Sequence, residues 1–144
     1  KQKTRDLLFE LTVKEGDPDR ISNITGTLSG IAGSFDLSSQ RICGEAMNTS
    51  FPFARTNNKI TAHTRLLGTT GLKQSLRIDL TFTDGSSQTI ENDLTDLLKN
   101  FNDDMPTPMY ITGDLLTPIE ADMTATIVGW ENGNEENGEN IEIY

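Results

Sequence analysis

The sequence has 144 residues, a formal net charge of −10 and 34% hydrophobic residues, which fits a single domain with its own core. It contains no run of 18 apolar residues, so no segment is expected to span a membrane as a helix. The acidic balance disfavours nucleic-acid binding, which needs clustered Lys and Arg. The single cysteine, Cys43, excludes an internal disulfide.

The charge is unevenly distributed along the chain. Residues 84–144 contain one basic residue, Lys99, and fourteen acidic ones, whereas residues 1–83 carry a small positive net charge. One interpretation is a solvated acidic surface that maintains solubility. The other is a polarised surface that orients the domain against a basic partner.

Alternating apolar and polar residues predict β-strands from the start of the chain. The first strand covers 7–14, with its odd-numbered apolar residues on one face. A Gly- and Pro-containing turn at 15–19 leads to a second strand at 21–29. Ile21 has the wrong parity for the apolar face of that strand, which predicts a β-bulge near its beginning.

The next part of the sequence lacks a clear period. Residues 31–37 are expected to form a short extended piece, and 38–58 a long ordered loop. Period-two alternation returns at 59–67, where Ile60, Ala62 and Leu66 face inward and His63 lies on the opposite face.

The longest regular strand is predicted at 72–83. Its inward set is Leu72, Leu76, Ile78, Leu80 and Phe82. The Asp84-Gly85 pair that follows predicts a tight type I′ hairpin turn, with a partner strand at 87–91.

One short helix is predicted after Asp93, whose side chain can accept from unpaired N–H groups at the helix start. Apolar residues recur there at helical spacing: Leu94, Leu97, Leu98 and Phe101. Further strands are expected at 109–112, at 123–128 and at 141–144. Seven to eight short strands with one short helix indicate an all-β fold, a sandwich or a barrel.

The sequence offers no convincing catalytic or metal site. His63 is the only histidine, and no nucleophile elbow or phosphate-binding glycine motif occurs. The segment 132–139 is rich in oxygen donors but departs from the spacing of a calcium loop, so a solvated turn is the better interpretation. We therefore expect no enzyme activity, no cofactor and no bound metal.

Aromatic residues are the remaining candidates for ligand contact. Trp130, Tyr110 and Tyr144 have the parity of the polar face and could form one small platform for a ligand or partner. Sugar-binding β-sandwiches use exposed aromatic rings of this kind, so a carbohydrate-binding module is an alternative function.

Several segments, taken in order, resemble one known family. Residues 20–33, the strand and Asp-Gly turn at 76–85 followed by 92–98, and the closing strands at 125–131 and 141–143 are similar to the FimB/Mfa2-type fimbrial anchor and tip lipoproteins of Bacteroidales. A related Bacteroidales lipoprotein family shares the pattern. The sequence departs from it at Ala121-Asp122-Met123, where the family has Gly-Gly-Phe.

The resemblance implies a transthyretin-like or Ig-like antiparallel β-sandwich at 1–144, the C-terminal part of a longer two-domain precursor. It also implies export to the outer membrane or cell surface, and a non-enzymatic structural or adhesive role as a fimbrial anchor or assembly-terminating subunit. Partners would be other fimbrial subunits or surface proteins, with glycan as the alternative ligand and membrane contact only through a lipid anchor. Cys43 lies mid-domain, so the lipidated cysteine of such proteins is expected to lie outside this chain.

Overall fold

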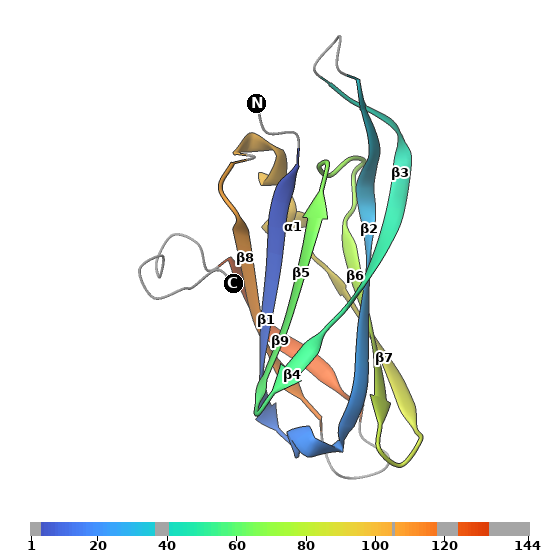
Figure 1. The fold of residues 1–144 in the computed structure, drawn as a ribbon, viewed down its shortest axis with the longest axis vertical. Helices are drawn as coiled ribbons and strands as arrows, with labels where there is room; N and C mark the ends of the chain where they lie inside the picture. Colours follow the sequence, from blue (N-terminus) through green and yellow to red (C-terminus); the bar gives the residue numbers. More distant parts are fainter. Residues whose placement is uncertain (1–3, 37–40, 105, 118–123, 133–144) are drawn as a thin grey trace.

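The fold consists of two β-sheets packed face to face (Figure 1). The computed structural model describes residues 4–36, 41–104, 106–117 and 124–132. In chain order its strands are β1 (Arg5–Glu15), β2 (Ile21–Asp36), β3 (Arg41–Pro52), β4 (Ala54–Thr56), β5 (Lys59–Leu66), β6 (Ser75–Phe82), β7 (Ser87–Asp93), β8 (Met109–Leu116) and β9 (Thr126–Asn132). The helical segments are η1 (Pro18–Arg20), α1 (Thr95–Leu98) and η2 (Phe101–Asp103). The predicted all-β sandwich with one short α-helix is confirmed.

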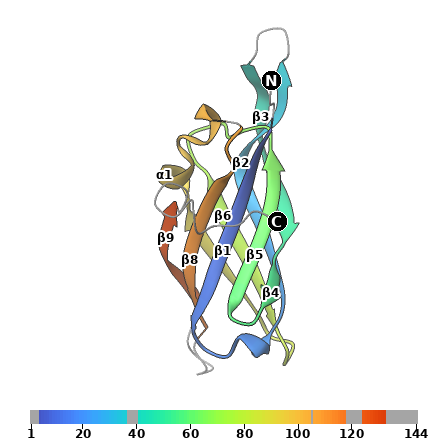
Figure 2. The same ribbon diagram turned by 60° about the vertical axis from the view of Figure 1, so that its left-hand side comes forward.

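The five-stranded sheet has the order β4-β5-β1-β8-β9, and the four-stranded sheet has the order β3-β2-β6-β7. All strand pairs are antiparallel except β1 with β8, which is parallel. The parallel pair makes β1 the middle strand of its sheet, with β5 on one side and β8 on the other (Figure 2). Alternation along a strand cannot reveal this pairing, because it reports the face of a residue and not its neighbour strand.

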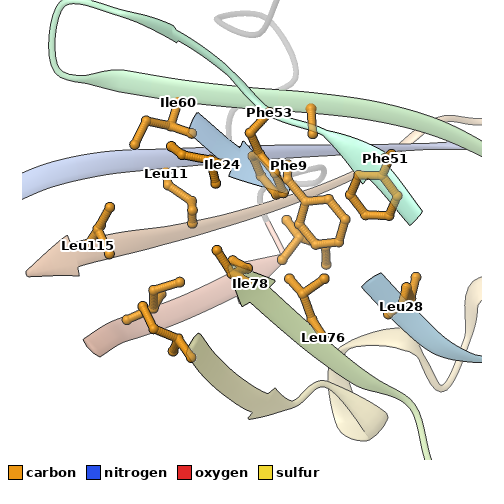
Figure 3. Packing of buried hydrophobic residues seen from close by; sticks show 14 of the residues in the cluster. Phe9, Leu11, Ile24, Leu28, Phe51, Phe53, Ile60, Leu76, Ile78 and Leu115 are labelled. Carbon is orange, nitrogen blue, oxygen red and sulfur yellow. The ribbon is translucent and has the colours of Figure 1, made fainter. Parts of the chain in front are cut away.

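The core lies between the two sheets and follows the predicted alternation. Inward residues of β1, β5 and β6 are buried, including Leu7, Leu11, Ile60, Leu76, Ile78 and Leu80. At its centre, the ring of Phe9 stacks on Phe51 with centroids 5.8 Å apart and contacts Phe53 at 6.0 Å (Figure 3). Phe9 comes from one sheet and Phe51 from the other, so this aromatic cluster joins the two layers.

β2 and β3 contain the irregularities that obscured the sequence period. The predicted bulge near Ile21 is confirmed, because the register with β6 shifts between Ile21 and Asn23. The long loop expected at 38–58 is wrong, because most of the described part of this region, 41–52 and 54–56, forms β3 and β4. β3 pairs with β2 through two register shifts, and each shift reverses the parity of the residues beyond it. The period of two therefore breaks although both segments are strands.

The expected start of the strand at Leu72 is also wrong. Leu72 is 97% exposed, and β6 begins only at Ser75. Gln74 explains the difference, because its buried side-chain amide donates to the carbonyl oxygens of Thr70 and Gly30 at 3.1 and 3.4 Å. These bonds hold the preceding residues in a loop that turns Leu72 to solvent.

The apolar residues predicted at helical spacing after Asp93 face the core, but the α-helix covers only part of the segment that contains them. Leu94, Leu98 and Phe101 are buried, while α1 covers only four residues and gives way to η2. Arg5 is buried beside this segment and donates to the carbonyl oxygen of Phe101 at 2.7 Å. Burial lowers the pKa of the Arg5 guanidinium, although Asp104 and Asp103 oppose this effect.

Among the described residues, no helix has the length and apolar character needed to cross a membrane.

The Asp84-Gly85 hairpin is present, but its turn is not type I′. That type requires positive φ at both central residues, and here Gly85 has a φ of 92° while Asp84 is not in the left-handed region. The Gly85 N–H donates to Phe82 O at 2.9 Å and the Phe82 N–H donates to Ser86 O at 2.8 Å. This pattern is a three-residue loop with glycine in the left-handed position, the arrangement that forms a G1 bulge.

Replacing Gly85 with valine should lower the free energy of unfolding by about 1–2 kcal/mol, because a β-branched residue is strained at positive φ. A Cβ atom at this position would meet nothing within 4 Å, so the cost comes from the backbone alone. Gly85→Asn is the matched control, since asparagine tolerates this conformation and should cost less. Equal denaturation midpoints for the valine variant and the wild type would contradict the prediction.

Candidate functional site

Tyr110, one of the three candidate contact residues, lies on the outer face of the five-stranded sheet. Its neighbours Met109 and Ile111 are buried in the core, so alternation turns Tyr110 outward, where it is half-buried. In register it lies opposite Leu8 of β1, and Leu8 lies opposite His63 of β5. An aromatic, an aliphatic and an imidazole side chain therefore follow one another across three adjacent strands.

A charged cluster borders this row. Asp6 Oδ1 accepts from Arg65 Nε at 2.9 Å and lies 3.0 Å from His63 Nε2. The hydrogen bond from Arg65, followed by the one from His63, lowers the pKa of the Asp6 carboxyl below its ordinary value of 3.8. We call Asp6, Leu8, His63, Arg65 and Tyr110 the outer-face cluster.

The lowered pKa of Asp6 makes part of the stability depend on pH. The ionised carboxylate stabilises the folded state above pH 3.8, and this contribution is lost as the pH falls through the lowered folded-state pKa. Asp6→Asn should therefore reduce stability at neutral pH by less than about 1 kcal/mol, since the partners are exposed. The difference between variant and wild type should vanish in strong acid. Thermal melts across the acidic range test this, and a difference that grows in acid would contradict it.

Trp130 lies elsewhere, on the inner side of the same sheet. The register of β8 and β9 shifts so that Gly129 and Trp130 lie opposite the single residue Gly113. Gly129 has a φ of 68°, and this bulge reverses the parity of β9. Trp130 therefore packs edge-on against Phe9, with centroids 6.5 Å apart.

Two further features fit Trp130 into the core. A Cβ atom on Gly113 would lie 3.1 Å from the Trp130 ring, so the glycine leaves the space that the ring occupies. The Trp130 indole N–H donates to Asn92 Oδ1 of β7, a strand of the opposite sheet. Beside this bond, the Ala125 N–H donates to Gln88 Oε1 of β7 at 2.6 Å. We call these two bonds the β7–β9 seam.

Trp130 and Tyr110 therefore do not form the predicted aromatic platform together. Tyr110 faces outward and Trp130 faces the core, on opposite sides of one sheet. Tyr144, the expected strand at 141–144 and most of the oxygen-rich segment at 132–139 lie outside the described residues. Cys43 is in β3, opposite Ser34 of β2, and within the described ranges no group of three His, Cys, Asp or Glu residues could hold a metal.

The other members of the outer-face cluster could not be predicted from the sequence. Leu8, Asp6 and Arg65 gave no signal, because only the parallel pairing of β1 with β8 brings Tyr110 beside Leu8. The outward parity of His63 was the one available hint, and it is confirmed. The four-stranded sheet differs, since the outward positions of β2 and β6 hold small polar or charged residues such as Thr25, Thr27, Ser29, Arg77, Asp79 and Thr81.

This geometry suits binding. The cluster lies on the outer sheet face, with the His63 and Arg65 side chains 47% and 63% exposed. A half-buried aromatic and aliphatic centre with charged groups at its border is typical of a protein contact.

Comparison with known proteins shows which solved structures share this fold. No family model matches the sequence, and no curated protein matches it. Among solved structures, a candidate adhesin from Bacteroides ovatus has a TM-score of 0.60 at 13% identity, covering 85% of this chain and 50% of that chain. The fimbrial anchor protein Mfa2 from Porphyromonas gingivalis has a TM-score of 0.59 at 15% identity, covering 91% of this chain and 47% of that chain. The chain thus spans about half the length of each structure and shares its β-sandwich fold.

Proposed function

We propose that this chain is a sandwich domain of a cell-surface fimbrial component, with a structural or adhesive role and no enzymatic activity. The observation that carries the proposal is the shared fold with two proteins described as a candidate adhesin and a fimbrial anchor, over 85% and 91% of this chain. The segments that resemble the FimB/Mfa2-type family support the same role. A transthyretin-like sandwich, export to the outer membrane and a lipid anchor outside this chain belong to the proposal.

The domain would form one half of a longer protein. Both solved structures are about twice as long as the part that this chain matches. The proposal assigns this chain to the C-terminal half, as the resemblance implies, and gives it an anchoring or assembly-terminating position. Its partners would be other fimbrial subunits or surface proteins.

The outer-face cluster is the proposed contact with such a partner. Leu8 and Tyr110 are large side chains that lie half-buried and side by side in register on the outer face of the five-stranded sheet. Burial of aromatic residues at a protein interface commonly contributes a large share of the binding free energy. Neighbouring charged groups such as Arg65 would orient the partner.

Deleting the gene in the cells that produce the protein tests the anchoring role. Loss of the protein should release fimbriae into the medium, as measured by immunoblotting of cell and medium fractions and by electron microscopy. Complementation with the wild-type gene should restore attachment, and complementation with a Leu8→Ser/Tyr110→Ala variant should restore it only in part. A Thr25→Ala/Thr27→Ala variant on the opposite sheet is the control. Unchanged fimbriae after deletion would contradict the proposal.

A second candidate function is carbohydrate binding, favoured by the position of Tyr110. Its half-buried ring lies in the same sheet as the Asp6, His63 and Arg65 side chains, which can hydrogen-bond to hydroxyl groups. A glycan array with the purified chain tests this, with Tyr110→Ala and Arg65→Ala expected to lose the signal. Trp130 should not be required, because it packs in the core. Absence of saturable glycan binding by the wild type would rule this candidate out.

A further inference from the structure

We propose that the loop at 67–74, together with the adjacent part of β3, is the surface on which the other half of the longer protein docks. This inference rests on the proposed function, which assigns this chain to the C-terminal half of a protein about twice its length. It names the surface through which the two halves contact each other. We call Ala46, Met47, Gly71 and Leu72 the loop patch.

The loop patch brings together apolar side chains that the sandwich itself leaves exposed. Leu72 is 97% exposed and Met47 is 55% exposed, and among the described residues Val128 of β9 is the one other exposed large apolar residue, at 47%. An ideal Cβ atom built on Gly71 would lie 3.9 Å from the Ala46 Cβ, so the tip of the loop reaches β3 at the residue before Met47. Two of these three exposed side chains therefore lie on segments that meet at one place on the surface.

Hydrogen bonds on two sides fix the loop that carries Leu72. Two backbone hydrogen bonds of 2.8 and 2.9 Å attach it to Gly30 and Ala32 of β2. On the other side, Asn102 of η2 accepts from the Thr69 N–H and donates to the Thr69 carbonyl oxygen, both at 2.9 Å. The loop therefore holds Leu72 in a defined position, so little conformational entropy would be lost when a partner covers it.

The start of β1 lies at the same end of the sandwich as this loop (Figure 1). Arg5 lies opposite Leu66, the last residue of β5 before the loop. The Arg5 guanidinium also donates to Phe101 O at 2.7 Å in η2, the segment that Asn102 ties to the loop. If this chain is the C-terminal half, the other half joins it through the start of β1 and therefore lies next to the loop patch.

The small size of the loop patch favours a covalently linked partner over a separate one. Stable contacts between separate proteins bury about 800 Å² on each partner. The loop patch offers two exposed large side chains, Leu72 and Met47. A domain on the same chain has an effective concentration on the order of millimolar when the linker is short, so a weaker contact suffices to hold it. Separate partners remain assigned to the outer-face cluster.

Thiol labelling of the full-length protein tests this docking. Three variants each place one cysteine in a Cys43→Ser background: Leu72→Cys and Met47→Cys within the loop patch, and Val128→Cys outside it. Mass spectrometry reads the rate of maleimide labelling at each site, normalised to the rate for the same variant in denaturant. Val128→Cys is the matched control because this residue is also a large apolar side chain exposed on the sandwich, but lies in β9.

Docking should reverse the order of reactivity that the sandwich alone would give. Leu72 is 97% exposed against 47% for Val128, so a free surface would make position 72 the faster of the two. We expect labelling at position 72 to be at least roughly tenfold slower than at position 128, because a tenfold change needs only about 1.4 kcal/mol of docking free energy. Met47→Cys leaves Leu72 in place and should also be slowed, which covers a weakening of the contact by Leu72→Cys itself.

Labelling at both patch positions as fast as at position 128, or faster, would overturn the inference. Protection that appears only after purified fimbriae are added would identify a separate partner and would also overturn it. These outcomes differ from failures of the proposed function. A gene product whose other half follows this chain would contradict the C-terminal placement, and gene deletion without release of fimbriae would contradict only the anchoring role.

Discussion

Replacing Phe9 with alanine should lower the free energy of unfolding by about 3–5 kcal/mol. The Phe9 side chain is 1% exposed and contacts aromatic rings on three sides: Phe51, Phe53 and Trp130. Alanine would remove the contacts that join the two sheets and leave a cavity lined by rings that cannot collapse into it. Chemical denaturation of the purified chain measures the loss.

The matched control for this prediction is Leu8→Ala. Leu8 is the adjacent residue of β1 but lies half-buried on the outer face, so its truncation should cost about 1 kcal/mol or less. The two variants together test the assignment of faces in β1. Equal destabilisation by both would show that the inward and outward positions have been misassigned.

Replacing Leu80 with alanine should destabilise the fold by about 2–5 kcal/mol, for the same combination of lost transfer free energy and residual cavity. Leu80 is completely buried at 0% exposure. It lies in β6, an interior strand, opposite Ile24 of β2 on one side and Gln88 of β7 on the other. The cavity would therefore open in the centre of the four-stranded sheet, where neighbouring strands limit relaxation.

Thr81→Ala provides the control within the same strand. Thr81 faces outward and is only half-buried, so its replacement should change the stability by about 0.5 kcal/mol. Thermal and chemical denaturation of both variants check the register of β6. If both substitutions were equally mild, the inward set of this strand would be displaced by one residue.

Much of the local structure follows from the sequence. Alternation at 7–14, 59–67 and 72–83 identified three strands and the faces that they bury, although the third strand begins only at Ser75. The parity of Ile21 even indicated the bulge near the start of β2. Such inferences succeed because successive side chains of a strand point to opposite faces, a geometric property of the chain itself.

Less of the candidate site could be predicted from the sequence. Tyr110 was found by its outward parity, but the same argument failed for Trp130. The Gly129 bulge turns Trp130 into the core, where the missing side chain of Gly113 makes room for it. A bulge depends on the register between two strands, which alternation within one strand cannot report. The seam with Asn92 was equally invisible, since β7 and β9 are separated by more than thirty residues in sequence.

The uneven charge distribution depends on both the sequence and the tertiary structure. The sequence by itself determined that acidic residues gather after residue 84, and that strands dominate with one short helix. Only the tertiary structure decided that β8 and β9 lie side by side and that β9 contacts β7 of the opposite sheet, so that the described strands after residue 84 gather on one side of the sandwich. The tertiary structure likewise decided the parallel pairing of β1 with β8 and the strand nature of β3. Side-chain alternation is set by neighbouring residues, whereas partner strand, register and bulges are set by packing between residues that are distant in sequence.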